Sequence, residues 1–481
     1  MSSDNNNEGL RLRRTKSVSR AEDVVKEEQR VRRSQPDKPC HRPRDSLFSW
    51  SSGFTDFTGL VNWAVILLFM GGLRLLLENF IKYGIRIDPE QWLIVLTGSH
   101  EGPGHPSIYL FLYSGVHNGL CFMIEKGLAA NIIPDNIGVI AHVVNICVMI
   151  TIPMIAITLK STGFSLMGAS FVCFIYSVMF LKLWSYAQVN YWCRKAKNAP
   201  AKGHVRRQSM SSETEKIANG HENMRLVVYP DNVTVKDFIF FIWAPTLCYE
   251  LNFPRTDRIR KRFLLKRLIE VVVLFQLIAC LFQQWIIPSV KNSLIPFSNM
   301  DVMKATERLL KLSIPNHLVW LTWFYLMFHS FLNLVGELLH FADRNFYCDW
   351  WNADNIDTFW RTWNMPVHRW AVRHLYIPLV EQGYGKTFAS TSVFFLSAFF
   401  HEYLVSVPLR TFKIWAFMGM MAQIPLSLVS RFVQNKLGAK WGNVIVWTSL
   451  ILGQPLCIMM YYHDYVITHF GEALIDSYAE V

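Results

Sequence analysis

Charged residues are scarce in this sequence. They make up 17% of its 481 residues, against about a quarter of an ordinary soluble domain. Hydrophobic residues make up 51%, and they gather in runs of about 20, the length that an α-helix needs to cross a membrane. This composition argues against a soluble globular domain and predicts an all-α polytopic membrane protein.

Paired cysteines and a leader segment are also missing. The nine cysteines are scattered, with no CxxC pair and no His/Cys ligand spacing, so we expect neither a disulfide framework nor a metal site. Residues 1–40 contain no apolar stretch, so we expect no cleaved signal peptide. The net charge of +12 is concentrated in residues 1–59 and 189–262. This distribution indicates membrane topology and not nucleic-acid binding.

The apolar runs divide the chain into about nine expected spans, of which the fifth is Phe263–Pro288. Nine crossings place the termini on opposite sides, and the positive-inside rule places the N-terminus in the cytosol. Amphipathic helices at the cytosolic interface would help the spans to enclose an intramembrane reaction chamber. The expected organisation is a basic, mostly disordered cytosolic segment (1–59), four spans (60–188), a cytosolic linker with a basic interfacial end (189–262), two spans (263–341), an amphipathic aromatic segment (342–388), three spans (389–468) and a lumenal tail (469–481).

The most informative residue is His401, which lies deep in the apolar run Ala389–Leu409. An ionisable side chain at this depth is a functional candidate, because it is costly unless it faces a cavity or a partner. An uncharged imidazole can accept the proton of a hydroxyl that attacks a carbonyl, or it can simply join two helices. The neighbouring Glu402 either fixes the imidazole tautomer or pairs with a cation. Ser397, one turn earlier, either lines the site or bonds to a helix carbonyl.

Side-chain amides are the next candidates. Gln454 lies at a matching depth in the last span, and it either donates to a developing oxyanion or joins helices. Asn364 either caps the helix that Pro366 begins or binds substrate. Asn352 is expected to cap a helix over residues 354–363. Other polar residues in the spans are each more readily explained as structural, namely His317, His329, Asn333, Glu337 and His463.

Several blocks of sequence resemble the membrane-bound O-acyltransferase family, and most closely its diacylglycerol acyltransferases. They are Phe346–Asn352, which fits the motif FYxDWWN, together with Thr362–Trp370, Ala398–Arg410 and Gly419–Pro425. The resemblance implies transfer of a fatty acyl group from acyl-CoA to diacylglycerol, with no cofactor besides these substrates. It also implies residence in the endoplasmic reticulum membrane, among membrane lipids, as a homodimer or homotetramer.

The resemblance further implies which residues form the site. His401 matches the family's catalytic histidine, and Asn364, Glu402 and Gln454 match other polar positions of its active centre. Ser390 stands where the most similar relatives are expected to carry a basic residue, which leaves the contacts to the CoA phosphates open. The residues expected to handle acyl-CoA are Tyr347, Asp349, Trp350, Trp351, Asn352, Trp360, Trp363, His368, Tyr376, Lys386, Ser397 and Gln423.

Three alternatives remain open from the sequence, one of which is an inactive scaffold, against which the intact His401 and Asn364 argue. Sterol acyltransferases share FYxDWWN but differ from the run Met365–Trp370 found here. A membrane transporter would use a buried His and Gln to line a permeation path, although it would not need an FYxDWWN-like block and would release no CoA thiol.

Overall fold

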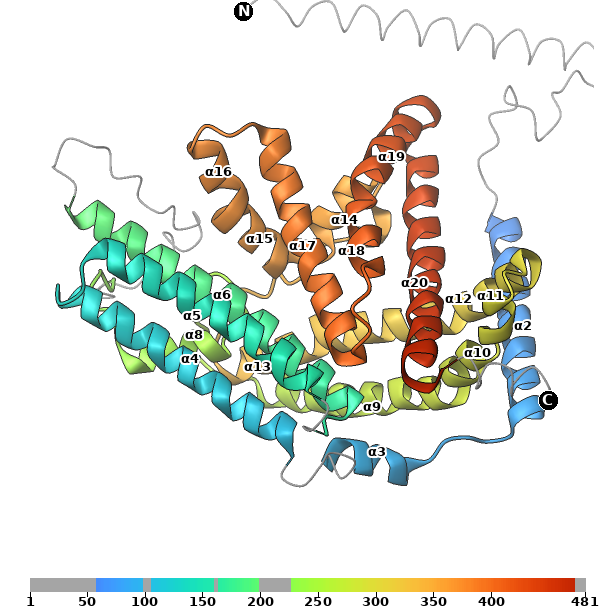
Figure 1. Ribbon diagram of the computed structural model, residues 1–481. Coiled ribbons are helices and arrows are strands. Elements are labelled where there is room, and N and C mark those ends of the chain that lie inside the picture. The colour runs from blue at the N-terminus through green and yellow to red at the C-terminus, as the bar shows by residue number, and fades with distance from the viewer. Residues whose placement is uncertain (1–57, 98–104, 160–162, 199–225, 472–481) are drawn as a thin grey trace, which may run out of the picture. The chain divides into compact units, whose positions relative to one another are not determined.

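The computed structural model describes residues 58–97, 105–159, 163–198 and 226–471 (Figure 1). Every regular element in these ranges is a helix, apart from one isolated antiparallel bridge between Arg255 and Phe341. The predicted all-α class is therefore confirmed. The chain divides into two compact units, Met1–Leu75 and Leu76–Val481, and the described residues of the first unit belong to helix α2 (Thr58–Tyr83).

Eight stretches of helix in the described ranges are long and apolar enough to cross a membrane, which confirms the expected multi-pass architecture. They lie in α2, α4 (Pro106–Ala129), α5 (Asp135–Thr158), α6 (Leu166–Asn198), the continuous stretch α12–η4–α13 (Val302–Phe324, Tyr325–Phe331 and Leu332–Leu338), α17 (Lys386–Leu409), the pair α18–α19 (Trp415–Met421 and Gln423–Leu437) and α20 (Ala439–Phe470). Shorter helices between them include α3 (Pro89–Thr97), α8 (Val235–Trp243) and α11 (Leu294–Ser298).

The fifth expected span, Phe263–Pro288, is helical but is not among these eight. It falls in α9 (Lys261–Leu281), η3 (Phe282–Ile286) and α10 (Ile287–Lys291). Lys266, Arg267 and Glu270 interrupt its apolar run, so the segment is less suited to lipid than its neighbours. The number of candidate spans in the described residues is thus eight, where we expected about nine.

Helices α4, α5 and α6 pack against one another and lie side by side in Figure 1. Their shared core is apolar, with Met149 of α5 and Val172 of α6 fully buried. Helix α6 also packs against α17, where the rings of Phe180 and Phe400 lie 5.0 Å apart at an angle of 66°. Edge-to-face contacts of this kind stabilise aromatic pairs beyond the apolar area that they bury. Helix α6 therefore joins the three-helix group to the helix that carries His401.

Short helices form the aromatic segment between α13 and α17. They are η5 (Trp350–Asn352), α14 (Ile356–Thr362), α15 (Met365–Ala371), η6 (Val372–Tyr376) and α16 (Ile377–Glu381).

The helix cap predicted at Asn352 is wrong. The Asn352 side chain does not cap α14. Instead Asn355 does, and its Oδ1 accepts from the Thr358 backbone N–H at 2.8 Å. Asn352 closes the preceding 3₁₀ turn, which delays the start of α14. Asn364 caps α15, one of the two roles that the sequence left open, since its Oδ1 accepts from the Val367 N–H at 3.1 Å.

The N-terminal end of α20 lies against the turn that follows the FYxDWWN block. A Cβ atom at Gly442 would lie 1.9 Å from the Asp354 carbonyl oxygen, so only glycine permits this approach. Asn443 donates from Nδ2 to the carbonyls of Trp351, at 3.1 Å, and Ala353, at 2.7 Å. The last span is thereby anchored on the aromatic segment.

Parts of the expected organisation lie outside the described residues. They are residues 1–57 of the basic segment 1–59, residues 199–225 of the linker 189–262 and residues 472–481 of the tail 469–481.

Candidate active site

His401 lies in the second half of α17 and is held by its own helix. Its Nδ1 lies 2.7 Å from the Ser397 carbonyl oxygen and 3.5 Å from the Ser397 hydroxyl. A carbonyl only accepts, so Nδ1 carries the proton and donates to it, and Nε2 keeps its lone pair. The sequence left two roles open for Ser397, and the structure shows that its carbonyl sets the imidazole tautomer.

The imidazole of His401 is accessible, although its flanks on α17 are packed. Ala398 and Tyr403 are buried, while His401 is exposed. Helical residues two positions apart point about 200° apart, so His401 faces away from Phe399, on the other side of the helix. The His401 ring is therefore accessible, and it lies on the side of α17 opposite to Phe399.

The Glu402 carboxylate ties α17 to two other helices. It accepts from the Tyr461 hydroxyl of α20, at 2.7 and 2.8 Å, from the Phe417 N–H of α18, at 2.9 Å, and from the Ser406 hydroxyl. Within the described ranges it contacts neither the His401 ring nor a cation. We had expected one of those two contacts, and the sequence offered no signal for Tyr461, because the two residues are 59 positions apart.

Gln454 lies inside α20, directly before the buried Pro455. Its Oε1 accepts from Asn316 Nδ2 of α12 at 3.2 Å. The interhelical contact that we considered for Gln454 is therefore present. It uses only the oxygen of the amide, so Nε2 remains a possible donor to a substrate.

A chain of contacts runs between the elements that carry these residues. Tyr461, the partner of Glu402, lies seven residues after Gln454 and so projects from nearly the same face of α20. On the other side, Trp320 of α12 lies four residues after Asn316 and stacks on Trp363, with ring centroids 5.5 Å apart. Trp363 directly precedes Asn364. No hydrogen bond in the described ranges joins His401 itself to Gln454 or Asn364, so these contacts connect only the helices that carry the three candidates.

The FYxDWWN block splits into a buried and an exposed part. The Trp350 side chain is 2% exposed and packs edge-on against Phe324 and Trp320, so it supports the segment from within. The Tyr347 hydroxyl lies 2.8 Å from Nδ1 of His329, and burial raises the pKa of this phenol. Asp349, Trp351 and Asn352 are exposed.

The other residues expected to handle acyl-CoA lie mostly at the surface or half-buried. Lys386 is exposed at the first turn of α17, and Tyr376 is half-buried at the end of η6. Burial lowers the pKa of His368, and the nearby Arg361 and Arg369 lower it further. This imidazole is thus uncharged near neutral pH. Trp360 is half-buried on α14, and Gln423, the first residue of α19, donates to the Gly419 carbonyl of α18 at 3.3 Å.

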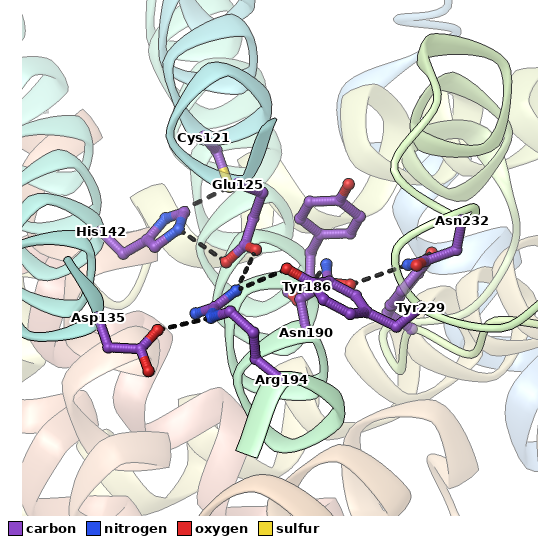
Figure 2. A network of polar contacts seen from close by, with 10 residues as sticks. Cys121, Glu125, Asp135, His142, Tyr186, Asn190, Arg194, Tyr229 and Asn232 are labelled. Carbon is purple, nitrogen blue, oxygen red and sulfur yellow. Dashed lines mark hydrogen bonds and ion pairs between the residues drawn. The ribbon is translucent and has the colours of Figure 1, made fainter. Parts of the chain in front are cut away.

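Sequence reasoning missed a buried polar network among α4, α5 and α6 (Figure 2). Arg194 donates to Glu125, at 2.7 Å, and to Asp135, at 2.8 Å. The other Glu125 oxygen lies 3.0 Å from His142 Nε2, and Cys121 Sγ lies 3.7 Å from His142 Nδ1. This order of groups is similar to a Cys–His–acid triad, but Cys121 has no exposed surface. The network therefore joins helices and offers no nucleophile to a substrate.

A second buried pair, Ser185 and His374, is also saturated. Ser185 Oγ lies 2.8 Å from His374 Nε2 and accepts from the Tyr249 N–H at 2.7 Å. His374 Nδ1 lies 2.8 Å from Gln188 Oε1, and the ring stacks on Trp192 at 5.6 Å. Since each of these polar groups already has a partner, the pair joins η6 to α6.

Comparisons with known proteins show which family the chain belongs to. A profile described as MBOAT, membrane-bound O-acyltransferase family, matches residues 135–463. Diacylglycerol O-acyltransferase 1 of Bos taurus is 47% identical over 432 residues, which cover 90% of this chain and 86% of that protein. The Homo sapiens protein of the same name is 46% identical over 90% of this chain and 85% of its own length. Diacylglycerol O-acyltransferase 1B of Glycine max is 37% identical over 89% of this chain and 82% of its own length. Because the family profile matches more than half of this chain, the chain belongs to the membrane-bound O-acyltransferase family.

Proposed function

We propose that this chain is an enzyme that transfers a fatty acyl group from acyl-CoA to the free hydroxyl of diacylglycerol, giving triacylglycerol and CoA. The observation that carries the proposal is the likeness to relatives named diacylglycerol O-acyltransferase 1, which reaches 47% identity over 90% of this chain. The tautomer of His401 set by Ser397 supports it, because the reaction needs a proton acceptor.

His401 acts as the general base in this proposal. Its Nε2 lone pair accepts the hydroxyl proton while the diacylglycerol oxygen attacks the thioester carbonyl, a form of assistance worth about 10²–10⁴-fold in rate. The new C–O bond forms, the C–S bond breaks, and the departing thiolate of CoA takes the proton from the imidazolium. No acyl-enzyme is required, so the gain from holding both reactants in line is large.

The neighbouring polar residues have separate roles. Gln454 donates from Nε2 to the oxyanion that develops on the thioester carbonyl, and one such donor contributes about 3 kcal/mol. The Oδ1 atom of Asn364 is engaged in the helix cap, so Asn364 offers its Nδ2 group to the substrate. Glu402 is a positioning residue, because its contacts hold α17 against α18 and α20.

Acyl-CoA is placed with its charged part at the cytosolic mouth. Lys386 and Arg373 supply positive charge there, and the exposed part of the FYxDWWN block lies in the same interfacial segment of the chain. The acyl chain runs inward past the aromatic side chains, and diacylglycerol enters sideways from the bilayer. Neutral His368 serves as a hydrogen-bonding group and not as a cation.

We further propose residence in the endoplasmic reticulum membrane as a homodimer or homotetramer, with a cytosolic N-terminus and a lumenal C-terminus. Opposite termini require an odd number of crossings, so with the eight candidate spans of the described residues this topology needs α9 to cross as well. The basic run Arg258–Arg267 at the start of α9 supports a cytosolic position for that end.

The test uses membranes that contain the full chain, labelled oleoyl-CoA, and diacylglycerol and cholesterol offered together. We expect triacylglycerol as the main product, one CoA thiol released per ester, and a loss of about 10²–10⁴-fold on His401→Ala. His469→Ala, at the exposed end of α20, is the matched control and should keep its activity.

Three results would contradict the proposal. Unreduced synthesis by His401→Ala removes the base assignment. A preference for cholesterol changes the acceptor. Movement of lipid without release of CoA thiol points to transport.

A further inference from the structure

A cavity of about 600 Å³ lies at the beginning of α9. It is lined by Thr256, Asp257, Arg258, Arg260, Ala342 and Arg344, and none of these residues takes part in the reaction proposed above. Two chain segments form its walls, and backbone hydrogen bonds join them. The Thr256 N–H donates to the His340 carbonyl at 2.9 Å, and the Ala342 N–H donates to the Pro254 carbonyl at 3.0 Å. The walls are therefore fixed relative to each other.

Positive charge exceeds negative charge around this cavity. The buried Glu337 carboxylate accepts from both Arg260, at 2.8 Å, and Arg344, at 3.1 Å. One carboxylate thus faces two guanidinium groups. Burial lowers the pKa of Arg344, and the attraction of Glu337 offsets only part of this effect. Arg258 is exposed and has no ion pair within the described ranges. With Asp257 included, three arginines face two carboxylates, which leaves one positive charge.

Two polar atoms in the walls are buried without a hydrogen-bond partner in the described part of the chain. They are Thr256 Oγ1 and Arg344 Nε. An unsatisfied buried group costs about 1–3 kcal/mol, so native structures seldom contain one without a reason. Gly336 permits the placement of Arg344, since a Cβ there would lie 2.6 Å from Arg344 Nη1. Neither atom has accessible surface in this structure, so an anion with several acceptor oxygens would satisfy them once the two side chains turn towards the cavity.

The surface that follows the cavity along α9 is apolar. Leu265, Leu268, Ile269, Val272 and Val273 are each between 48% and 58% exposed. At 1.5 Å per residue, this face begins about 8 Å along the helix from Arg260. A basic rim followed directly by an exposed apolar face is typical of a helix that meets a membrane at the level of the headgroups.

We propose that this cavity binds the phosphate group of an anionic membrane phospholipid. Guanidinium groups match phosphate oxygens in geometry and charge, and the Thr256 hydroxyl adds a donor. The lipid tails then lie along the exposed apolar face of α9. This binding is independent of acyl transfer, because no residue of the cavity contacts the proposed reaction centre.

The test measures the thermal unfolding of the purified full chain in detergent against increasing dioctanoyl phosphatidylserine. Dioctanoyl phosphatidylcholine and inorganic phosphate serve as comparison ligands. We expect only phosphatidylserine to raise the melting temperature at low concentration. The variants Thr256→Val and Arg258→Gln remove cavity groups without breaking a side-chain contact, so they should fold and should each weaken the apparent affinity about tenfold. Arg262→Gln removes an equal charge from an exposed position outside the lining and should change it less than twofold.

Three outcomes would overturn the inference. Equal weakening by Arg262→Gln would mean unspecific attraction to a basic surface. An equal shift with inorganic phosphate would mean an anion site without a lipid preference. Displacement of the lipid by CoA, with a raised KM for oleoyl-CoA in Arg258→Gln, would make the cavity a part of the substrate site.

Discussion

Asn316 of α12 holds the side-chain amide of Gln454 on α20, through a hydrogen bond of 3.2 Å from Nδ2 to Oε1. Because the oxygen of Gln454 is engaged, its Nε2 group is directed to the other side of the amide. A donor that is already oriented stabilises developing charge without reorganisation in the reaction. Asn316 is therefore a positioning residue for the proposed oxyanion donor.

Replacing Asn316 tests this relationship. Asn316→Leu removes the hydrogen bond at similar volume, so the Gln454 amide can rotate. We expect kcat to fall about tenfold with little change in the KM for oleoyl-CoA, since an interaction made in the transition state is lost. The double variant with Gln454→Leu should be no slower than Gln454→Leu alone, because the two residues act as one unit.

Ser313→Ala is the matched control for that experiment. Ser313 lies one turn earlier on α12, and within the described ranges its hydroxyl bonds only to the Leu309 carbonyl, so the kcat of Ser313→Ala should be unchanged. Additive losses in the double variant would show that Asn316 does not act through Gln454.

Gly442→Ala tests the anchoring of α20 on the aromatic segment. The new methyl group would lie 1.9 Å from the Asp354 carbonyl oxygen, and relief of such a clash costs typically about 1–3 kcal/mol. Thermal unfolding in detergent should show a lower melting temperature. Gly453→Ala lies on the same helix, and beyond its chain neighbours and its own helix backbone no atom of the described residues lies within 4 Å of the new Cβ, so it should be neutral or stabilise by up to about 1 kcal/mol. Equal melting temperatures for both variants would disprove the close approach.

Glu125→Ala tests the network of Figure 2. The change leaves the buried guanidinium of Arg194 without its shortest ion pair, and breaking a buried pair costs about 3–5 kcal/mol. The melting temperature should drop sharply. Glu307→Ala breaks an exposed pair with Lys311 at 2.9 Å and should cost less than about 0.5 kcal/mol. A loss for Glu125→Ala as small as for Glu307→Ala would show that the network does not stabilise the helix packing.

The buried imidazole of His374 should make the folded protein less stable in acid. Burial lowers the pKa of this imidazole to about 3, with a smaller contribution from Arg373, whereas in the unfolded chain it titrates near 6.5. Between these values the unfolded state binds the proton and the folded state does not. The free energy of unfolding therefore has its full value, as far as His374 decides it, above about pH 6.5. It falls as the pH drops towards 3.

The measurement is the melting temperature at pH 7 and at pH 5. His374→Gln stays neutral, so the difference between the two pH values should shrink relative to the unmodified chain. His469→Gln, at an exposed position, should leave the difference as it was. An undiminished pH dependence in His374→Gln would assign it to other groups.

Helix class, membrane spans and some helix caps can be predicted from the sequence, because residues close together along the chain decide them. The apolar runs predicted the all-α class and most of the spans, because hydropathy along some 20 residues decides whether a helix can lie in lipid. The Pro366 that follows Asn364 made a helix cap one of the two roles open to it, and the structure shows that cap. Near Asn352 the same reasoning was wrong by three positions, since an extra 3₁₀ turn precedes α14 and nothing in the local pattern announces it.

The contacts within the candidate site depended on packing. Glu402 accepts from Tyr461, and Gln454 from Asn316, across 59 and 138 positions. A single sequence carries no signal for such pairs, because each partner has several plausible alternatives until the helices are placed. The same holds for Glu125 and Arg194, whose charges give no local indication that they meet in a buried network.

The sequence by itself determined that this chain forms membrane helices, that an imidazole lies deep within one of them, and which family the motifs resemble. Hydropathy and short motifs suffice for this, as they are read along the chain. Only the tertiary structure decided that the Ser397 carbonyl orients His401, that Glu402 ties helices together, and that Asn316 holds Gln454. Those outcomes depend on which hydrogen-bonding groups the packed helices bring within about 3 Å of one another.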